Sequence, residues 1–121
     1  MGEGENPKRF DLEDRTFYFA KRVRAFLKKL NRTVANIEDG KQLVRASGSV
    51  GANYIEANEA LSKKDFTMRI KICRKEAKES RYFLRLLDTV DCPDVETERG
   101  MLIQEAQELT SIFGAIVRKT E

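Results

Sequence analysis

The sequence predicts an all-α protein, an antiparallel up-down-up-down four-helix bundle, from three observations. Apolar or small residues recur at alternating spacings of four and three along four segments. No strand-like alternation, internal repeat or low-complexity tract competes with this pattern. The connections are only a few residues long, so consecutive helices should run in opposite directions. We therefore expect one bundle domain at 11–121, preceded by a flexible arm at 1–10.

The first two helices are expected at 11–32 and 37–61, with Asp11 and Asn36 as their N-caps. The core positions of the first are Leu12, Thr16, Phe19, Val23, Phe26 and Leu30. Those of the second are Leu43, Ser47, Val50, Tyr54, Ala57 and Leu61. Because glycine lowers helix propensity, Gly48 and Gly51 inside the second helix predict a close approach of a neighbouring backbone.

The third and fourth helices are expected at 63–89 and 94–119. Ser62 followed by Asp65 resembles a capping box at the start of the third helix. The core positions of the third helix are Phe66, Ile70, Cys73, Ala77, Ser80, Leu84 and Leu87. Those of the fourth are Val95, Leu102, Ala106, Leu109, Phe113 and Ile116. Acidic residues in the first turns of the fourth helix and basic residues in its last turn complement the helix dipole.

The composition predicts a soluble protein of a reducing cytoplasm. No apolar run approaches membrane-spanning length, and the amino-terminal residues lack the hydrophobic segment of a secretion signal. The two cysteines have no disulfide-framework or metal-ligand spacing. The chain contains no histidine, which excludes Glu-x-x-His di-iron chemistry and nucleophiles activated by histidine. We therefore expect no cofactor and no metal.

Positive charge is concentrated in two of the expected helices. Residues 62–88 contain nine basic and four acidic residues, and residues 8–32 contain nine basic and three acidic ones. If these helices shared a face, their side chains could follow a phosphate backbone. The candidate nucleic-acid contacts are Lys21, Arg22, Lys28, Lys29, Arg69, Lys71, Arg74, Lys75, Lys78, Arg81 and Arg85. Solvated helix faces paired with acidic neighbours would give the same pattern.

A polar face on the second helix is the other candidate site. Its residues follow one another at spacings of three and four, beside the small-residue core positions: Gln42, Arg45, Ser49, Asn53 and Glu56. With Glu76 of the third helix, they are expected to form a polar network or a subunit interface. A ligand pocket is the alternative.

Three segments carry a family resemblance: residues 42–57 (QLVRASGSVGANYIEA), 62–66 (SKKDF) and 75–84 (KEAKESRYFL). With them, the chain over about residues 10–118 resembles the bacterial 23S rRNA intervening-sequence proteins. The resemblance implies a helical bundle that assembles into a ring, typically a homopentamer, with no established catalytic activity. Related bundle proteins bind nucleic acid, so the resemblance makes RNA or DNA the expected ligand.

Two alternatives to nucleic-acid binding remain open. A second apolar stripe could mark self-association, a protein partner or a broader core: Phe17, Tyr18, Ile72, Tyr82, Phe83, Leu86, Ile103 and Ile112. Carboxylates three residues apart, Glu56 with Glu59 and Glu76 with Glu79, could hold Mg²⁺ in a nucleotide pyrophosphatase-like enzyme. We expect a non-enzymatic homo-oligomer that binds nucleic acid, with a protein-interaction scaffold as the main alternative.

Overall fold

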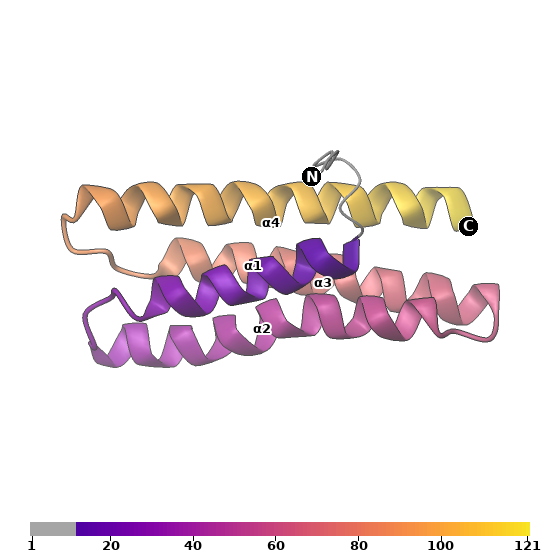
Figure 1. Ribbon diagram of the computed structural model, residues 1–121, viewed down its shortest axis with the longest axis horizontal. Helices are drawn as coiled ribbons and strands as arrows, with labels where there is room; N and C mark the ends of the chain where they lie inside the picture. The colour runs from indigo at the N-terminus through magenta and orange to yellow at the C-terminus, as the bar shows by residue number, and fades with distance from the viewer. Residues whose placement is uncertain (1–11) are drawn as a thin grey trace, which may run out of the picture.

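The computed structural model describes residues 12–121, which form four α-helices. They are α1 (Leu12–Leu27), α2 (Val34–Asn58), α3 (Lys63–Leu86) and α4 (Pro93–Thr120). Figure 1 shows them side by side with their long axes nearly parallel. The predicted all-α four-helix fold is confirmed. The predicted arm at 1–10 and the predicted cap Asp11 lie outside the described residues.

Each helix packs against two neighbours, in the order α1, α2, α3, α4 and back to α1. Two contacts show that α1 and α4 run in opposite directions. Arg15, near the start of α1, contacts Glu105 of α4, whereas Lys29, just after the end of α1, contacts Glu98, which comes earlier in α4. The colours in Figure 1 show the same alternation of direction from each helix to the next. In this arrangement α1 and α3 lie diagonally across the bundle.

The core is formed mainly by the predicted positions. Phe19, Phe26, Leu43, Ile70 and Phe113 are at most 1% exposed. The close approach predicted at the α2 glycines is also present at Gly51, where an added Cβ would lie 2.9 Å from Thr16 Oγ1. Packing of these side chains against each other is the main favourable contribution to the stability of such a bundle.

Three predicted C-terminal ends of helices are wrong. The first helix ends at Leu27 rather than 32, because the N–H groups of Lys29 and Leu30 bond to carbonyls three residues back and close a turn. The second helix ends at Asn58 rather than 61, and Leu61, a predicted core residue, is 99% exposed. The third ends at Leu86 rather than 89, because extended backbone at Leu87 turns that side chain into the core.

The predicted start of the second helix is also wrong, because α2 begins at Val34 rather than 37 and Asn36 is not its N-cap. Thr33 is the cap, and its hydroxyl accepts a hydrogen bond from the Asn36 N–H. Asn36 instead lies in the first turn of α2, 5% exposed, with its side-chain amide bonded to the main chain of Asp88. Ser62 is confirmed as the cap of α3, since its hydroxyl accepts from the Asp65 N–H. Within residues 12–121, no helix has the length and apolar character to cross a membrane.

Candidate nucleic-acid interface and interhelical polar network

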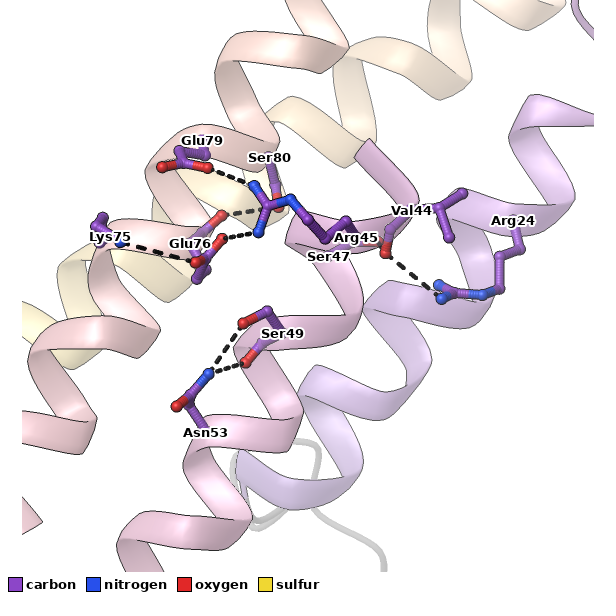
Figure 2. A network of polar contacts seen from close by, with 10 residues as sticks. All are labelled: Arg24, Val44, Arg45, Ser47, Ser49, Asn53, Lys75, Glu76, Glu79 and Ser80. Atoms are coloured by element: carbon purple, nitrogen blue, oxygen red, sulfur yellow. Dashed lines mark hydrogen bonds and ion pairs between the residues drawn. The ribbon is translucent and has the colours of Figure 1, made fainter. Parts of the chain in front are cut away.

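Arg45 of α2 bridges two carboxylates of α3, as Figure 2 shows. Its Nη1 lies 3.3 Å from Glu76 Oε1 and its Nη2 lies 2.7 Å from Glu79 Oε1. Glu76 is only 6% exposed, so its charge needs a partner, and Lys75 Nζ approaches its other oxygen at 4.0 Å. The hydrogen bond to Glu79 is the largest cause of a raised pKa at Arg45. The bridge connects α2 to α3 at mid-bundle.

A second polar contact between α2 and α3 lies two turns further along α2. Asn53 Nδ2 donates to the carbonyl oxygen and the hydroxyl of Ser49, each at 2.9 Å. Its Oδ1 accepts from Arg69 Nη1 at 3.0 Å. Arg69, predicted as a nucleic-acid contact, is thus engaged between helices. Both the oxygen and the nitrogen of the Asn53 side-chain amide are therefore hydrogen-bonded within the fold.

The predicted polar set is therefore divided. Arg45, Ser49, Asn53 and Glu76 participate in interhelical or local polar contacts, whereas Gln42 and Glu56 are exposed on α2. Glu79, absent from the predicted polar set, completes the Arg45 bridge. Its spacing of three residues from Glu76 was a sequence signal for this role, because both positions face the same neighbour in a helix.

The basic residues of the first segment do not share a face with those of α3, because α1 and α3 are diagonal in the bundle. Lys29 forms an ion pair with Glu98 at 2.7 Å, and Lys21 Nζ lies 5.9 Å from the centre of the Phe17 ring. Lys28 is exposed and Arg22 half-buried. The basic residues of the first and third helices therefore cannot form one continuous surface within a single chain, because these two helices are not neighbours.

The basic residues of α3 follow its outer side. A shallow pocket of about 400 Å³ is lined by Lys71, Arg74, Lys75, Lys78, Glu79 and Tyr82. Two of these lysines are partly neutralised, Lys71 by Glu121 at 2.8 Å and Lys75 by Glu76. Arg74 and Lys78 have no ion-pair partner within residues 12–121, and neither do Arg81 and the exposed Arg85. The outer side of α3 therefore keeps a net positive charge.

Arg81 has an unusual environment. Its Nε is the one buried side-chain nitrogen or oxygen of the described chain that has no hydrogen-bond partner. Arg81 follows Arg74 by seven residues and Thr67 by fourteen, so the three lie on one stripe of α3. Thr67 bonds to Thr120 of α4, and Arg74 packs beside Gly114 of α4. The stripe therefore faces the junction of α3 and α4.

The carboxylates proposed for magnesium are not gathered into a site. Glu76 and Glu79 face Arg45, while Glu56 is exposed on α2 and Glu59 is exposed just after its end. Among residues 12–121, no three acidic or cysteine side chains are placed to hold a metal ion together. The structure thus gives no geometric support to the magnesium alternative.

A further ion-pair cluster was not singled out from the sequence. Arg15 of α1 donates to both oxygens of Glu105 on α4, at 2.7 and 3.0 Å, and to Glu108 at 2.7 Å. The bond to Glu105 is the largest cause of a raised pKa at Arg15, and a hydrogen bond from Gln104 is the largest cause of a lowered pKa at Glu108. The sequence signal for this cluster was the presence of opposite charges on two helices expected to be antiparallel neighbours.

Fold and site define the class: a small all-α four-helix-bundle protein whose helices are joined by polar bridges at several levels. The chain belongs to the family described as 23S rRNA-intervening sequence protein, whose profile matches residues 8–115. It is similar to a crystal structure from Bacteroides thetaiotaomicron, described as a protein with unknown function from the S23 ribosomal protein family. The two share 28% identity with a TM-score of 0.75, over 88% of this chain and 97% of that one. Among curated proteins, none matches the chain significantly.

Proposed function

We propose that this protein is a non-enzymatic, cytoplasmic homo-oligomer that binds the phosphate backbone of nucleic acid through the outer side of α3. The observation that carries the proposal is the run of Arg74, Lys78 and Arg81, which have no ion-pair partner within residues 12–121. An unpaired cationic stripe attracts polyanions because binding releases their condensed counterions.

The spacing of the stripe suits a nucleic-acid strand. Arg74 and Arg81 are seven residues apart on one helix, which corresponds to about 10 Å along its axis. That length covers about three phosphates of one strand in a duplex. Exposed Tyr82 beside the pocket could stack on an unpaired base. No base-reading motif accompanies the stripe, so we expect recognition of charge and shape rather than sequence.

Lys78→Glu combined with Arg85→Glu tests the proposal, because both side chains are exposed and have no ion-pair partner within residues 12–121, so their replacement should not disturb the core. We expect affinity for a labelled single-stranded RNA to fall about tenfold or more at moderate salt, and the salt dependence to become shallower by about two phosphate contacts. Fluorescence anisotropy across a salt series measures both quantities.

The matched control is Lys21→Glu combined with Lys28→Glu. It changes the net charge by the same amount on the first segment, diagonal to α3. The proposal requires this control to weaken RNA binding much less than the α3 pair. Equal losses would indicate a response to net charge alone, and unchanged affinity in the α3 variant would reject the interface.

Oligomerisation is supported by apolar side chains left uncovered by a single bundle. Phe17, Tyr18, Tyr82 and Met101 are each between 52% and 57% exposed. A groove of about 620 Å³ between α1 and α2 has Phe17 and Ile55 among its walls and Gly48, Gly51 and Ala52 among its lining. Exposed apolar area of this kind commonly marks an interface. The expected ring of five copies comes from the family resemblance.

Light scattering of the purified protein tests this part of the proposal. A mass several times that of one chain, reduced by Phe17→Ser, would support self-association through the α1 side. A monomer that captures one protein from a nuclease-treated extract would instead favour the scaffold alternative. The ratio of absorbance at 260 and 280 nm in the same run reports whether nucleic acid accompanies the protein.

A further inference from the structure

Two arginines from different helices approach the same glycine, Gly114, at the junction of α3 and α4. A Cβ added to Gly114 would lie 3.6 Å from Arg118 Nη1 and 3.8 Å from Arg74 Cδ. Arg118 follows Gly114 by four residues, so its side chain leans back over the preceding turn of α4, while Arg74 comes across from α3. Gly114 has no side chain, and it is buried beneath them.

The approach of these two side chains is not explained by an internal counter-ion. Neither Arg74 nor Arg118 has an ion-pair partner within residues 12–121. The carboxylate of Glu121 interacts electrostatically with Arg74 but is bonded to Lys71 at 2.8 Å. The dipole of α4 favours a cation near its C-terminus, which accounts for Arg118 but not for Arg74 in the middle of α3.

The remaining charged neighbours are also mostly basic. Lys78 lies one turn beyond Arg74 on α3, and Lys119 follows Arg118 on α4. The buried Nε of Arg81 also lacks an acceptor, but Arg81 is seven residues, or about 10 Å, further along α3 and is not part of this site. The junction at Gly114 therefore combines excess positive charge with two guanidinium groups that have no carboxylate partner within residues 12–121.

We propose that Arg74 and Arg118 form a binding site for a phosphate group at the Gly114 junction of α3 and α4. Guanidinium groups suit this ligand because their planar N–H donors can bond two phosphate oxygens at once. The phosphate could be a free anion or one phosphodiester of a nucleic acid. The second case rests on the proposed function and would extend the interface from α3 onto α4.

Titration calorimetry with inorganic phosphate tests the site directly. Arg74→Gln and Arg118→Gln should each raise the dissociation constant for phosphate about fivefold or more. The matched control is Lys119→Gln, which removes the same charge from the adjacent position of the same helix. It should change the constant less than about twofold. Arg118 is exposed, so its variant should fold even if that of Arg74 does not.

Absence of measurable phosphate binding to the unmodified protein would overturn the site. Equal losses in Lys119→Gln and Arg118→Gln would overturn it as well, because they would indicate charge density without a defined geometry. Labelled single-stranded RNA distinguishes the two sources of phosphate. If Arg118→Gln weakens both ligands, the site holds a phosphodiester. If it weakens only inorganic phosphate, the site holds a free anion, and RNA binding stands or falls on Lys78 and Arg85.

Discussion

Asn36 forms two hydrogen bonds with the main chain of Asp88, fifty-two positions away in the sequence. Its Oδ1 accepts from the Asp88 N–H at 2.9 Å and its Nδ2 donates to the Asp88 carbonyl at 3.0 Å. The same Nδ2 lies 3.0 Å from the carbonyl of Asn31. One buried amide thus joins the first turn of α2 to the segment after α3 and to the preceding loop.

Replacing Asn36 with Ala should lower the free energy of unfolding by about 2–3 kcal/mol. The reason is that three main-chain groups lose their partner in a place that water reaches poorly. Chemical denaturation followed by circular dichroism measures the change. Gln42→Ala, an exposed polar residue of the same helix, is the control and should cost less than about 0.5 kcal/mol. A loss at Asn36 no greater than at Gln42 would contradict this interpretation.

Most of the fold was predictable because the alternating spacing of apolar residues recurs in four separate segments. Four stretches of alternating spacing identified four helices, and most of their core residues are buried as expected. The ends were less predictable because they depend on contacts distant in sequence. Asn36 is a good capping residue by type, but Thr33 is one too, and the pairing of Asn36 with Asp88 decides between them. Nothing local to residues 33–39 reveals that pairing.

Arg45→Gln should lower the free energy of unfolding by about 1–3 kcal/mol, because it leaves the Glu76 carboxylate buried with only Lys75 nearby at 4.0 Å. Glu76→Gln should cost less, since Arg45 is half exposed and retains Glu79. A double-mutant cycle of the two measures their coupling.

The control for this prediction is Lys41→Gln. Lys41 pairs with Glu38 at 3.4 Å on the surface, with both side chains more than 60% exposed. Losing that pair should cost less than about 0.5 kcal/mol. Similar losses for Arg45→Gln and Lys41→Gln would show that burial of Glu76 does not strengthen the bridge.

The candidate site was less predictable than the fold. The polar face of α2 indicated Arg45, Ser49 and Asn53 because residues three and four apart share a helix face. Spacing could not show which basic residues have partners across helices: Arg69 donates a hydrogen bond to Asn53, and Lys29 forms an ion pair with Glu98. The order of helices around the bundle separates the two basic segments, and that order follows from packing rather than from charge.

Val90 adopts a positive φ of 51° in the loop between α3 and α4. A β-branched residue is strained in this conformation, whereas glycine adopts it freely. Val90→Gly should therefore raise the free energy of unfolding by about 1 kcal/mol, after allowance for the greater freedom of glycine in the unfolded chain. Thermal denaturation measures the change. Val34→Gly, at an exposed helical position, is the control and should be neutral or slightly destabilising. If Val90→Gly instead lowers the free energy of unfolding, the contacts of the Val90 side chain outweigh the backbone strain.

The two cysteines should differ sharply in reactivity. Cys73 is fully buried in the core, and burial raises the pKa of its thiol to about 12, whereas Cys92 is exposed. Because the thiolate is the reactive form, a disulfide reagent at neutral pH should modify Cys92 rapidly and Cys73 only after unfolding. Counting released thiolate chromophore with and without denaturant measures this. Cys92→Ser leaves Cys73 as the sole thiol, and rapid labelling of that variant in its folded state would contradict the buried position.

The same burial predicts an alkaline loss of stability. The pKa of Cys73 rises from an ordinary value of 9.0 to about 12 on folding, so between these values the folded chain holds a proton that the unfolded chain has released. The free energy of unfolding should therefore be unaffected by this group below pH 9 and should decline as the pH rises towards 12. Cys73→Ala should be less stable at neutral pH but should show a shallower decline above pH 9, measured by urea denaturation at successive pH values. An identical slope in the variant would assign the alkaline loss to other groups.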